Sequence, residues 1–208
     1  MNYFDKKNRI LTNHLNIEAR EILIDGVGKI LVSCPHSVIH YRKGIEKYDE
    51  PDTLIVANYL HKIFNIPYIY KVKSDNEDAN YDLNSNYKEM VVNYIKNNDI
   101  KLLIDLHQLH QSRDEIVNIG INGFENINTT VYLNEFVKSF SNNNIGLVSI
   151  DEPFAASGAM TISNYVHNKT DIDCLQIELN CKLFKTSDKY KLVLKCFREA
   201  IKCINIEE

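Results

Sequence analysis

Short apolar runs alternate along the chain with segments whose apolar residues have helical spacing. The runs 30–34, 101–105 and 174–179 are typical of buried parallel strands, and further strands are expected at 22–24, 68–72, 116–120 and 147–150. Spacing at i, i+3, i+4 and i+7 predicts helices at 51–64, 90–95, 133–140, 161–166 and 190–201. This alternation predicts an α/β fold, a single-domain, mixed and mostly parallel sheet flanked by helices on both faces.

Two connecting segments carry turn signals or polar sequence. Gly26 and Gly28 stand between the first two runs, so residues 22–33 are expected to form a β-hairpin. The same glycines precede a strand, which favours a turn over a phosphate-binding loop. Residues 35–50 and 74–86 are predicted to be irregular because they are polar.

Size and charge exclude several classes of protein. A chain of 208 residues and 24.1 kDa fits one domain, residues 1–208. The net charge of -4 and the pI near 6.0 argue against a nucleic-acid partner. Residues 1–9 lack the apolar core of a signal peptide, and no stretch is long and uncharged enough to cross a bilayer. A cytoplasmic protein without a membrane partner is expected, and its five cysteines suit reduced thiols.

Three polar side chains accompany the three strongest apolar runs. His36 follows 30–34, His107 follows 101–105, and Glu178 lies within 174–179. Reactive groups in open α/β sheets gather at the carboxyl ends of the strands, so these side chains are expected to converge. Two neutral imidazoles can hold a divalent ion, and a carboxylate can take a proton from bound water. The pattern therefore predicts a metal-assisted hydrolase.

The two histidines support each other as metal ligands. Pro35 holds His36 on a strand-exit turn, where the ring alone could simply cap the turn. The equivalent place of His107 favours the ligand role for both. Asp105, two residues before His107 on the same face, could accept a hydrogen bond from its ring or could cap the strand end.

A third protein ligand for zinc is expected near the start of the helix at 51–64. Glu50 is the preferred candidate and Asp52 its main rival, since Asp52 could instead cap the helix. Glu46 and Asp49 are also near.

Glu178 is difficult to explain as a structural residue. A carboxylate between Ile177 and Leu179 has a desolvation cost unless a metal or an arginine compensates its charge. Beside a metal-bound water it would be a general base, and the alternative is a structural salt bridge.

Arg113 follows His107 closely and could bind a substrate carboxylate or a developing oxyanion, or could be a surface residue. His40 and His110 are interpreted as peripheral, because Pro35 fits a loop better than a helical His-x-x-x-His site. Cys34 and His36 suggest a thiolate nucleophile as a rival chemistry, although a thiol that ends an apolar run is more often a buried hydrophobe.

Together these motifs make the sequence similar to the N-formylglutamate amidohydrolase family, a branch of the zinc carboxypeptidase-like hydrolases. The matching segments, in chain order, are 33–37 (SCPHS), 50–53 (EPDT), 78–80 (DAN), 105–107 (DLH) and 176–180 (QIELN). Each is short, but their common order spans most of the chain.

The resemblance implies a phosphorylase/hydrolase-like fold, with one zinc ion held by His36, an acidic residue at 50–52 and His107. It also implies that Glu178 activates the metal water and that Asn80 binds substrate. Two positions depart from the family pattern: Val38 stands where glycine is usual, and Tyr81 stands where an arginine would bind a carboxylate. The loss of that arginine makes another N-acyl amino acid or a small peptide as plausible a substrate as formylglutamate.

The sequence thus predicts a Zn2+-dependent amidohydrolase that acts on a small linear amide, with Glu178 and Arg113 as catalytic residues. Arg113 and Asn80 would bind the substrate, and His36, Glu50 and His107 would bind the metal. The alternatives are a catalytically inactive ligand-binding protein on the same fold and a cysteine hydrolase that uses Cys34.

Overall fold

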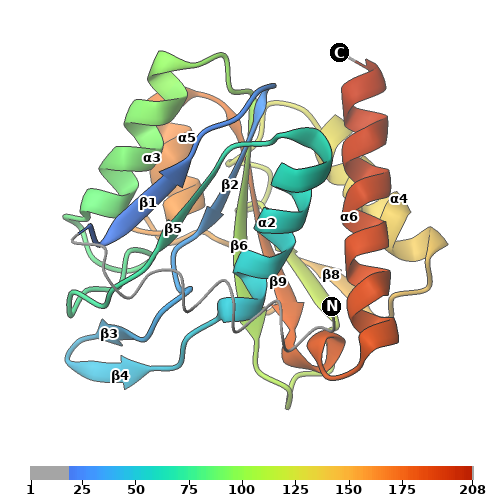
Figure 1. The fold of residues 1–208 in the computed structure, drawn as a ribbon, viewed down its shortest axis with the longest axis horizontal. Coiled ribbons are helices and arrows are strands. Elements are labelled where there is room, and N and C mark those ends of the chain that lie inside the picture. The colour runs from blue at the N-terminus through green and yellow to red at the C-terminus, as the bar shows by residue number, and fades with distance from the viewer. Residues whose placement is uncertain (1–18, 208) are drawn as a thin grey trace.

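Seven strands form the central sheet of the computed structural model, which describes residues 19–207. Their order is β1 (Glu21–Ile24), β5 (Tyr68–Lys71), β2 (Ile30–Cys34), β6 (Leu102–Leu109), β9 (Asp173–Asn180), β7 (Val117–Gly120) and β8 (Val148–Ile150). Four strand pairs are parallel, whereas β1–β5 and β7–β9 are antiparallel. The mixed, mostly parallel sheet is confirmed (Figure 1). Residues 1–9, used above to exclude a signal peptide, lie outside the described residues.

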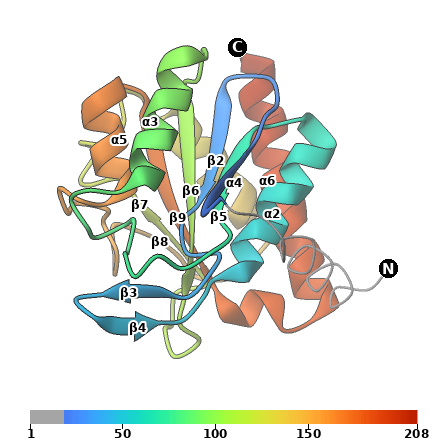
Figure 2. The ribbon, with the colours of Figure 1, turned by 60° about the vertical axis from the view of Figure 1, so that its left-hand side comes forward.

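Helices cover both faces of this sheet, as predicted (Figure 2). One face carries α2 (Pro51–Phe64), α4 (Val131–Asn142) and α6 (Ser187–Glu207), and the other carries α3 (Asn86–Asn97) and α5 (Ile162–Thr170). A short 3-10 helix, Cys181–Phe184, leads from β9 to α6. Within residues 19–207, no helix combines the length and the apolar character that crossing a bilayer requires.

Successive side chains of the central strands point to opposite faces of the sheet, so the core consists of two clusters. Leu102, Ile104 and Leu106 of β6 belong to the buried cluster under α2, α4 and α6. Leu103 faces the opposite cluster under α3 and α5, and residues 105 and 107 follow on the same side. Each central strand is thus apolar on both faces at its start and turns polar on the α3 and α5 side towards its carboxyl end.

The predicted hairpin over residues 22–33 is wrong. β1 pairs antiparallel with β5, which lies between β1 and β2. The connection crosses the start of β5, where Val27 N–H donates to the Asn65 carbonyl at 2.7 Å. A Cβ added at Gly26 would lie 2.1 Å from that oxygen. Glycine is therefore needed here because the two backbones approach closely, not because it forms a hairpin turn.

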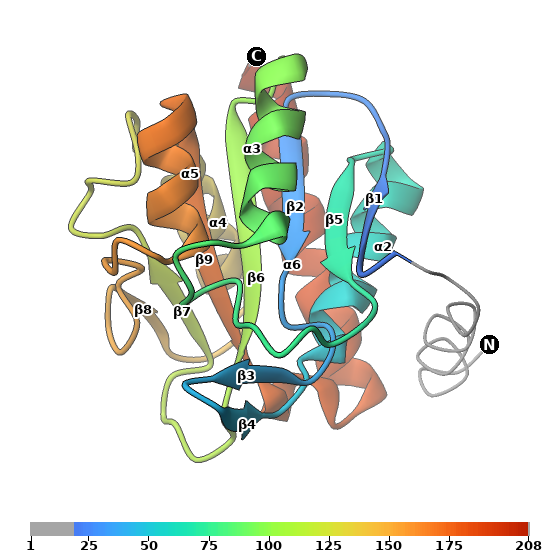
Figure 3. The same cartoon turned by 90° about the vertical axis from the view of Figure 1, so that its left-hand side faces the viewer.

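A different hairpin lies where the sequence predicts an irregular loop. β3 (His40–Arg42) pairs with β4 (Ile45–Lys47) as a separate two-stranded sheet. Its turn residues Lys43 and Gly44 have φ angles of 53° and 74°, the left-handed backbone of a tight two-residue turn. Figure 3 shows this hairpin beside the carboxyl ends of β2 and β6.

Candidate functional site

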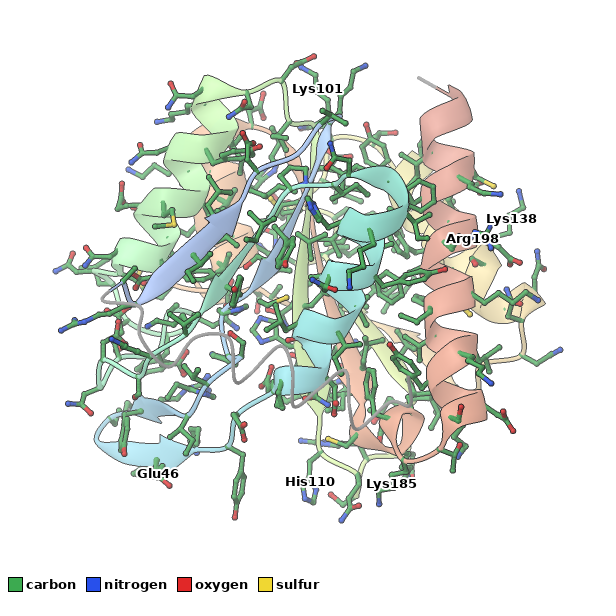
Figure 4. The ribbon with its side chains drawn as sticks, in the orientation of Figure 1. Glu46, Lys101, His110, Lys138, Lys185 and Arg198 are labelled. Carbon is green, nitrogen blue, oxygen red and sulfur yellow. The ribbon has the colours of Figure 1, made fainter. Side chains whose placement is uncertain are left out.

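The predicted site residues lie at the carboxyl ends of β2, β6 and β9. Figure 4 shows Glu46 and His110 at this end of the molecule and Lys101 at the opposite end. His36 lies in the turn after β2, whereas His107 and Glu178 lie within β6 and β9, which extend to Leu109 and Asn180. The strands are longer than predicted because their polar ends continue the parallel ladder, in which His107 is opposite Glu178.

His36, Glu50 and His107 bring three potential metal ligands together. The two Nδ1 atoms of His36 and His107 are 3.1 Å apart. Glu50 Oε1 is 3.2 Å from His36 Nδ1, and Glu50 Oε2 is 3.4 Å from His107 Nδ1. The ligand atoms of all three residues lie within 4.8 Å of one another. Two imidazole nitrogens and one carboxylate converging in this way suit a zinc ion.

The outer nitrogen of each imidazole contacts a buried carboxylate. His107 Nε2 is 3.1 Å from Asp105 Oδ2, the contact expected from the sequence. His36 Nε2 is 2.9 Å from Asp78 Oδ1, a contact that no sequence spacing indicated. When Nε2 donates to a carboxylate, Nδ1 keeps its lone pair for a metal, and the ring becomes a stronger ligand. The tautomers that these contacts favour therefore fit the proposed metal.

The structure places Glu50 rather than Asp52 in this cluster. Glu50 precedes the first residue of α2, and its backbone N–H donates to the His36 carbonyl at 2.6 Å. Its Oε2 accepts the backbone N–H of Gln108 at 3.0 Å. The side-chain amide of Gln108 donates instead to Asp52 Oδ2, at 3.1 Å. Gln108 thus holds both acids, and only Glu50 lies beside the imidazoles.

Protonation of the metal-free cluster is governed by these contacts. Burial raises the pKa of Glu50, but the charges of His36 and His107 outweigh it and lower that pKa to about 2. Burial lowers the pKa of His107, yet Asp105 and Glu50 outweigh it and hold that pKa well above its ordinary value. A divalent cation would replace the protons on these rings, so binding a metal here releases protons.

Glu178 lies next to this cluster with its side chain largely removed from solvent. Its residue is 7% exposed, and burial raises the pKa of Glu178 to about 7, a shift that the positive charge of His107 only partly opposes. Gln176 Nε2 donates to Glu178 Oε1 at 3.1 Å. A carboxylate with such a pKa, near the operating pH, is suited to proton transfer.

These groups open into a cleft of about 670 Å³. Arg113 and Asn80, the two residues predicted to bind substrate, both line it. The Arg113 guanidinium lies 5.6 Å from the centre of the Phe154 ring. Asn80 Oδ1 accepts the Ile162 N–H at 2.8 Å, and its Nδ2 lies 3.5 Å from Gln176 Oε1.

His40 lies closer to the cluster than the sequence predicts, so its interpretation as peripheral is wrong. Its ring stacks on His36 with 3.7 Å between centroids and 2° between planes. Burial and the charge of His36 lower the pKa of His40 to about 4, which keeps the ring neutral. The contact could not be predicted because it depends on the β3–β4 hairpin, which brings residue 40 back onto the turn that carries His36. His110, in contrast, lies exposed at the cleft edge.

Arg42, on the same hairpin, is a second site residue that sequence reasoning missed. Its Nε donates to Asp78 Oδ2 at 2.7 Å, and its guanidinium lies 5.2 Å from the centre of the Tyr81 ring. Tyr81 is the position where the resemblance described above would place an arginine. The only sequence signal was the Lys43-Gly44 pair, which is typical of a hairpin turn.

Cys34 does not have the environment of a nucleophile. Its residue is fully buried, and burial raises the pKa of its thiol far above the ordinary range. A thiol that stays protonated is a poor nucleophile. The structure thus favours a packing role for Cys34.

Sequence comparisons find no matching family model and no matching curated protein. Solved structures are similar in fold. A bacteriophage poly-gamma-glutamate hydrolase has a TM-score of 0.64 at 13% identity, with 97% of each chain covered. The N-formylglutamate amidohydrolase from Ralstonia eutropha has a TM-score of 0.56 at 11% identity, with 88% of this chain and 98% of that chain covered.

A metallo-carboxypeptidase from Burkholderia cenocepacia is also similar, with a TM-score of 0.56 at 9% identity over 98% of this chain and 70% of that chain. The fold of this chain is shared with N-formylglutamate amidohydrolase and metallo-carboxypeptidase structures, as the resemblance implies. At these identities the likeness establishes the fold alone, and residue roles depend on the geometry of the site.

Proposed function

We propose that this chain is a zinc-dependent hydrolase of small linear amides. The observation that carries the proposal is the convergence of His36 Nδ1, His107 Nδ1 and the Glu50 carboxylate, while each outer imidazole nitrogen contacts a carboxylate. His36, Glu50 and His107 would hold the ion. Zinc, when bound, would polarise the amide carbonyl and lower the pKa of a water molecule to about 7.

Glu178 is proposed as the general base. Its carboxylate would accept the proton of the attacking water and then give that proton to the leaving nitrogen. Glu178 is paired with His107 on the neighbouring strand, which keeps its carboxylate beside the proposed ligands. The Gln176 amide donates to one of its oxygens. Burial raises the pKa of Glu178 in the metal-free protein, and a neighbouring cation would lower that pKa, so the carboxylate can accept a proton from water near neutral pH and return it.

Arg113 and Asn80 are proposed to bind the substrate on the walls of the cleft. No acidic side chain within residues 19–207 forms a salt bridge with Arg113, so its guanidinium can bind a substrate carboxylate or the developing oxyanion. Asn80 is held by the Ile162 N–H, which directs the rest of its amide towards Gln176 and the cleft.

The substrate class is proposed as N-formyl or N-acyl amino acids and small peptides. Structures with this fold include hydrolases of N-formylglutamate and of poly-gamma-glutamate, both amides of an acidic amino acid. Arginine side chains at the cleft suit such substrates.

A ligand-binding protein without turnover is the main alternative. It would need the cleft and its cations but not a carboxylate poised beside the metal ligands. The position of Glu178 therefore favours an enzyme, because a buried carboxylate with a raised pKa stabilises neither the fold nor an anionic ligand.

The test combines metal analysis with turnover. The purified protein, reconstituted with Zn2+ and then freed of excess metal, should hold about one zinc ion per chain. It should also release free amine from at least one member of a panel of N-formyl, N-acetyl and dipeptide substrates. Zinc uptake without turnover of any of these substrates would favour the binding protein over the enzyme. A protein that takes up no zinc would refute the proposal.

A further inference from the structure

Arg42 is fixed at the wall of the cleft by two restraints. Its Nε donates to Asp78 Oδ2 at 2.7 Å, and Asp78 is completely buried. The central carbon of the guanidinium lies over the Tyr81 ring, 5.2 Å from the ring centre. A buried carboxylate and an aromatic face together hold the planar group in one orientation, so little side-chain entropy is left to lose when a ligand binds.

The terminal nitrogens of Arg42 remain available to a ligand. Its side chain is 39% exposed and lines the cleft. In the part of the chain that the structure describes, Asp78 is the one acid in a salt bridge with Arg42, through Nε. A guanidinium has five N–H donors, and the two terminal groups match the geometry of a carboxylate.

The charges around the cleft favour an anionic ligand. Its lining includes Arg42, Lys47 and Arg113, whereas Asp49 is the acid left once Glu50 and Glu178 are assigned to the metal and to proton transfer. Arg42 and Arg113 differ from Lys47 in being held against an aromatic ring. Lys47 is exposed on β4, so it contributes charge without a fixed geometry.

We propose that Arg42 is a specificity-determining residue that binds a carboxylate of the substrate at the β3–β4 hairpin. The inference rests on the proposed function and extends it to one ligand group. Asp78 contacts Arg42 with one oxygen and His36 Nε2 with the other, at 2.9 Å. The carboxylate would therefore bind on the far side of Asp78 from the metal ligand, as a group at one end of the substrate.

A purely structural role for Arg42 makes a different prediction. If Arg42 served only to neutralise Asp78, its loss would weaken all ligands equally through His36. A carboxylate-binding role instead affects only ligands that carry the second charge. The ratio of the affinities for a dicarboxylate and for its analogue without the second charge separates these two roles.

The experiment measures binding to zinc-loaded protein by calorimetry, without turnover. The probes are linear dicarboxylates from malonate to adipate, each paired with its monoamide, which lacks one charge. Wild type should bind at least one dicarboxylate about 10-fold or more tighter than its monoamide, the effect of one charge-assisted bidentate contact. Arg42→Gln should reduce that ratio by about 5-fold or more, and any preference that remains would come from the other cations of the cleft, such as Arg113. Lys47→Gln, which removes another cation from the same cleft, should keep most of the wild-type ratio.

Each other outcome overturns the proposal: no preference for any dicarboxylate in wild type, an unchanged ratio in Arg42→Gln, or an equal loss in Lys47→Gln. If Arg42→Gln does not fold, Arg42→Lys replaces it, because it keeps the charge opposite Asp78 but loses the planar fork, and an unchanged ratio again overturns the proposal. If the protein takes up no zinc, the proposed function fails separately, and the same ratios measured on metal-free protein still decide the role of Arg42.

Discussion

His107 and Glu178 are opposite each other on the parallel strands β6 and β9. Adjacent strands are separated by about 4.8 Å, so the ladder itself sets the spacing between the proposed ligand and the proposed base. Asp105 and Gln176 form the pair two positions earlier in the same register, and each contacts the proposed functional residue two positions later in its own strand. The sheet thus positions both proposed functional residues and their hydrogen-bond partners.

Loss of either imidazole should remove the metal. His36→Ala and His107→Ala should each lose bound zinc, because a site with three protein ligands rarely tolerates the loss of one. Asp105→Asn should have a smaller effect, a decrease of about 10- to 100-fold in zinc affinity. Competition with a chromogenic chelator measures these affinities. His110→Ala is the control and should bind zinc like wild type; full zinc occupancy in His36→Ala would exclude His36 as a ligand.

The acidic ligand can be identified by two amide substitutions. Glu50→Gln should weaken zinc binding more than Asp52→Asn, because Glu50 lies 3.2 Å and 3.4 Å from the two imidazoles, whereas Asp52 accepts from the Gln108 side chain. The same chelator competition ranks the two variants. The reverse order would assign the ligand to Asp52.

Glu178→Gln should keep zinc and lose activity. The amide preserves the shape of the side chain but cannot accept a proton, and general-base catalysis typically contributes about 100- to 10,000-fold in rate. Since the base acts when ionised, wild-type kcat/KM should rise with pH through an apparent pKa shared by Glu178 and the metal water. The variant should lack this rise or show it at another pH. Near wild-type turnover with zinc in place would refute the mechanism.

The same substitution should stabilise the metal-free protein. Burial raises the pKa of Glu178 to about 7, above its value in the unfolded chain, so its contribution to stability is lost as pH rises towards 7. A glutamine side chain does not titrate, so the variant lacks this dependence of stability on pH. Urea unfolding with a chelator present should show the variant gaining on wild type between about pH 4.5 and 7, by about 1–3 kcal/mol. The exposed Glu125→Gln should show no such trend; a constant difference across this range would contradict the assignment.

Arg113→Ala should act mainly on the affinity for charged substrates. KM for substrates with a carboxylate should rise by about 10-fold or more, and KM for neutral amides should change little. Steady-state kinetics on matched acid and amide substrates measure the difference. Equal decreases in kcat/KM for both would indicate that Arg113 stabilises the transition state or the structure instead.

The central strands and helices could be predicted because their apolar residues are buried on both faces. Leu31, Leu103 and Leu175 each have zero exposure in the middle of a strand. The ends were less predictable, because β6 and β9 continue through Gln108 and Asn180, whose polar side chains break the pattern while their backbones keep the ladder. The pairing of β1 could not be predicted either, since chain order suggested β2 and the sheet placed β5 between them.

Residues on or beside the strands were found from sequence because an acid or a histidine in an apolar run is conspicuous. His36, His107 and Glu178 were identified in this way. Asp78 and Arg42 were not, because their positions beside His36 arise from the tertiary packing of a polar loop against a short hairpin. Contacts between segments so distant in the chain cannot be recognised from the local sequence.

The β3–β4 hairpin forms a sheet of its own, separate from the ladder that holds His107 and Glu178. Changes in its length or sequence would leave the register of the seven-stranded sheet intact. Natural variation could therefore change the hairpin without disturbing the register of the strands that carry His107 and Glu178. If the proposed function holds, we expect proteins of this fold to differ in substrate preference at residues 41–47 while the strands beneath remain the same, which would separate selectivity from reaction.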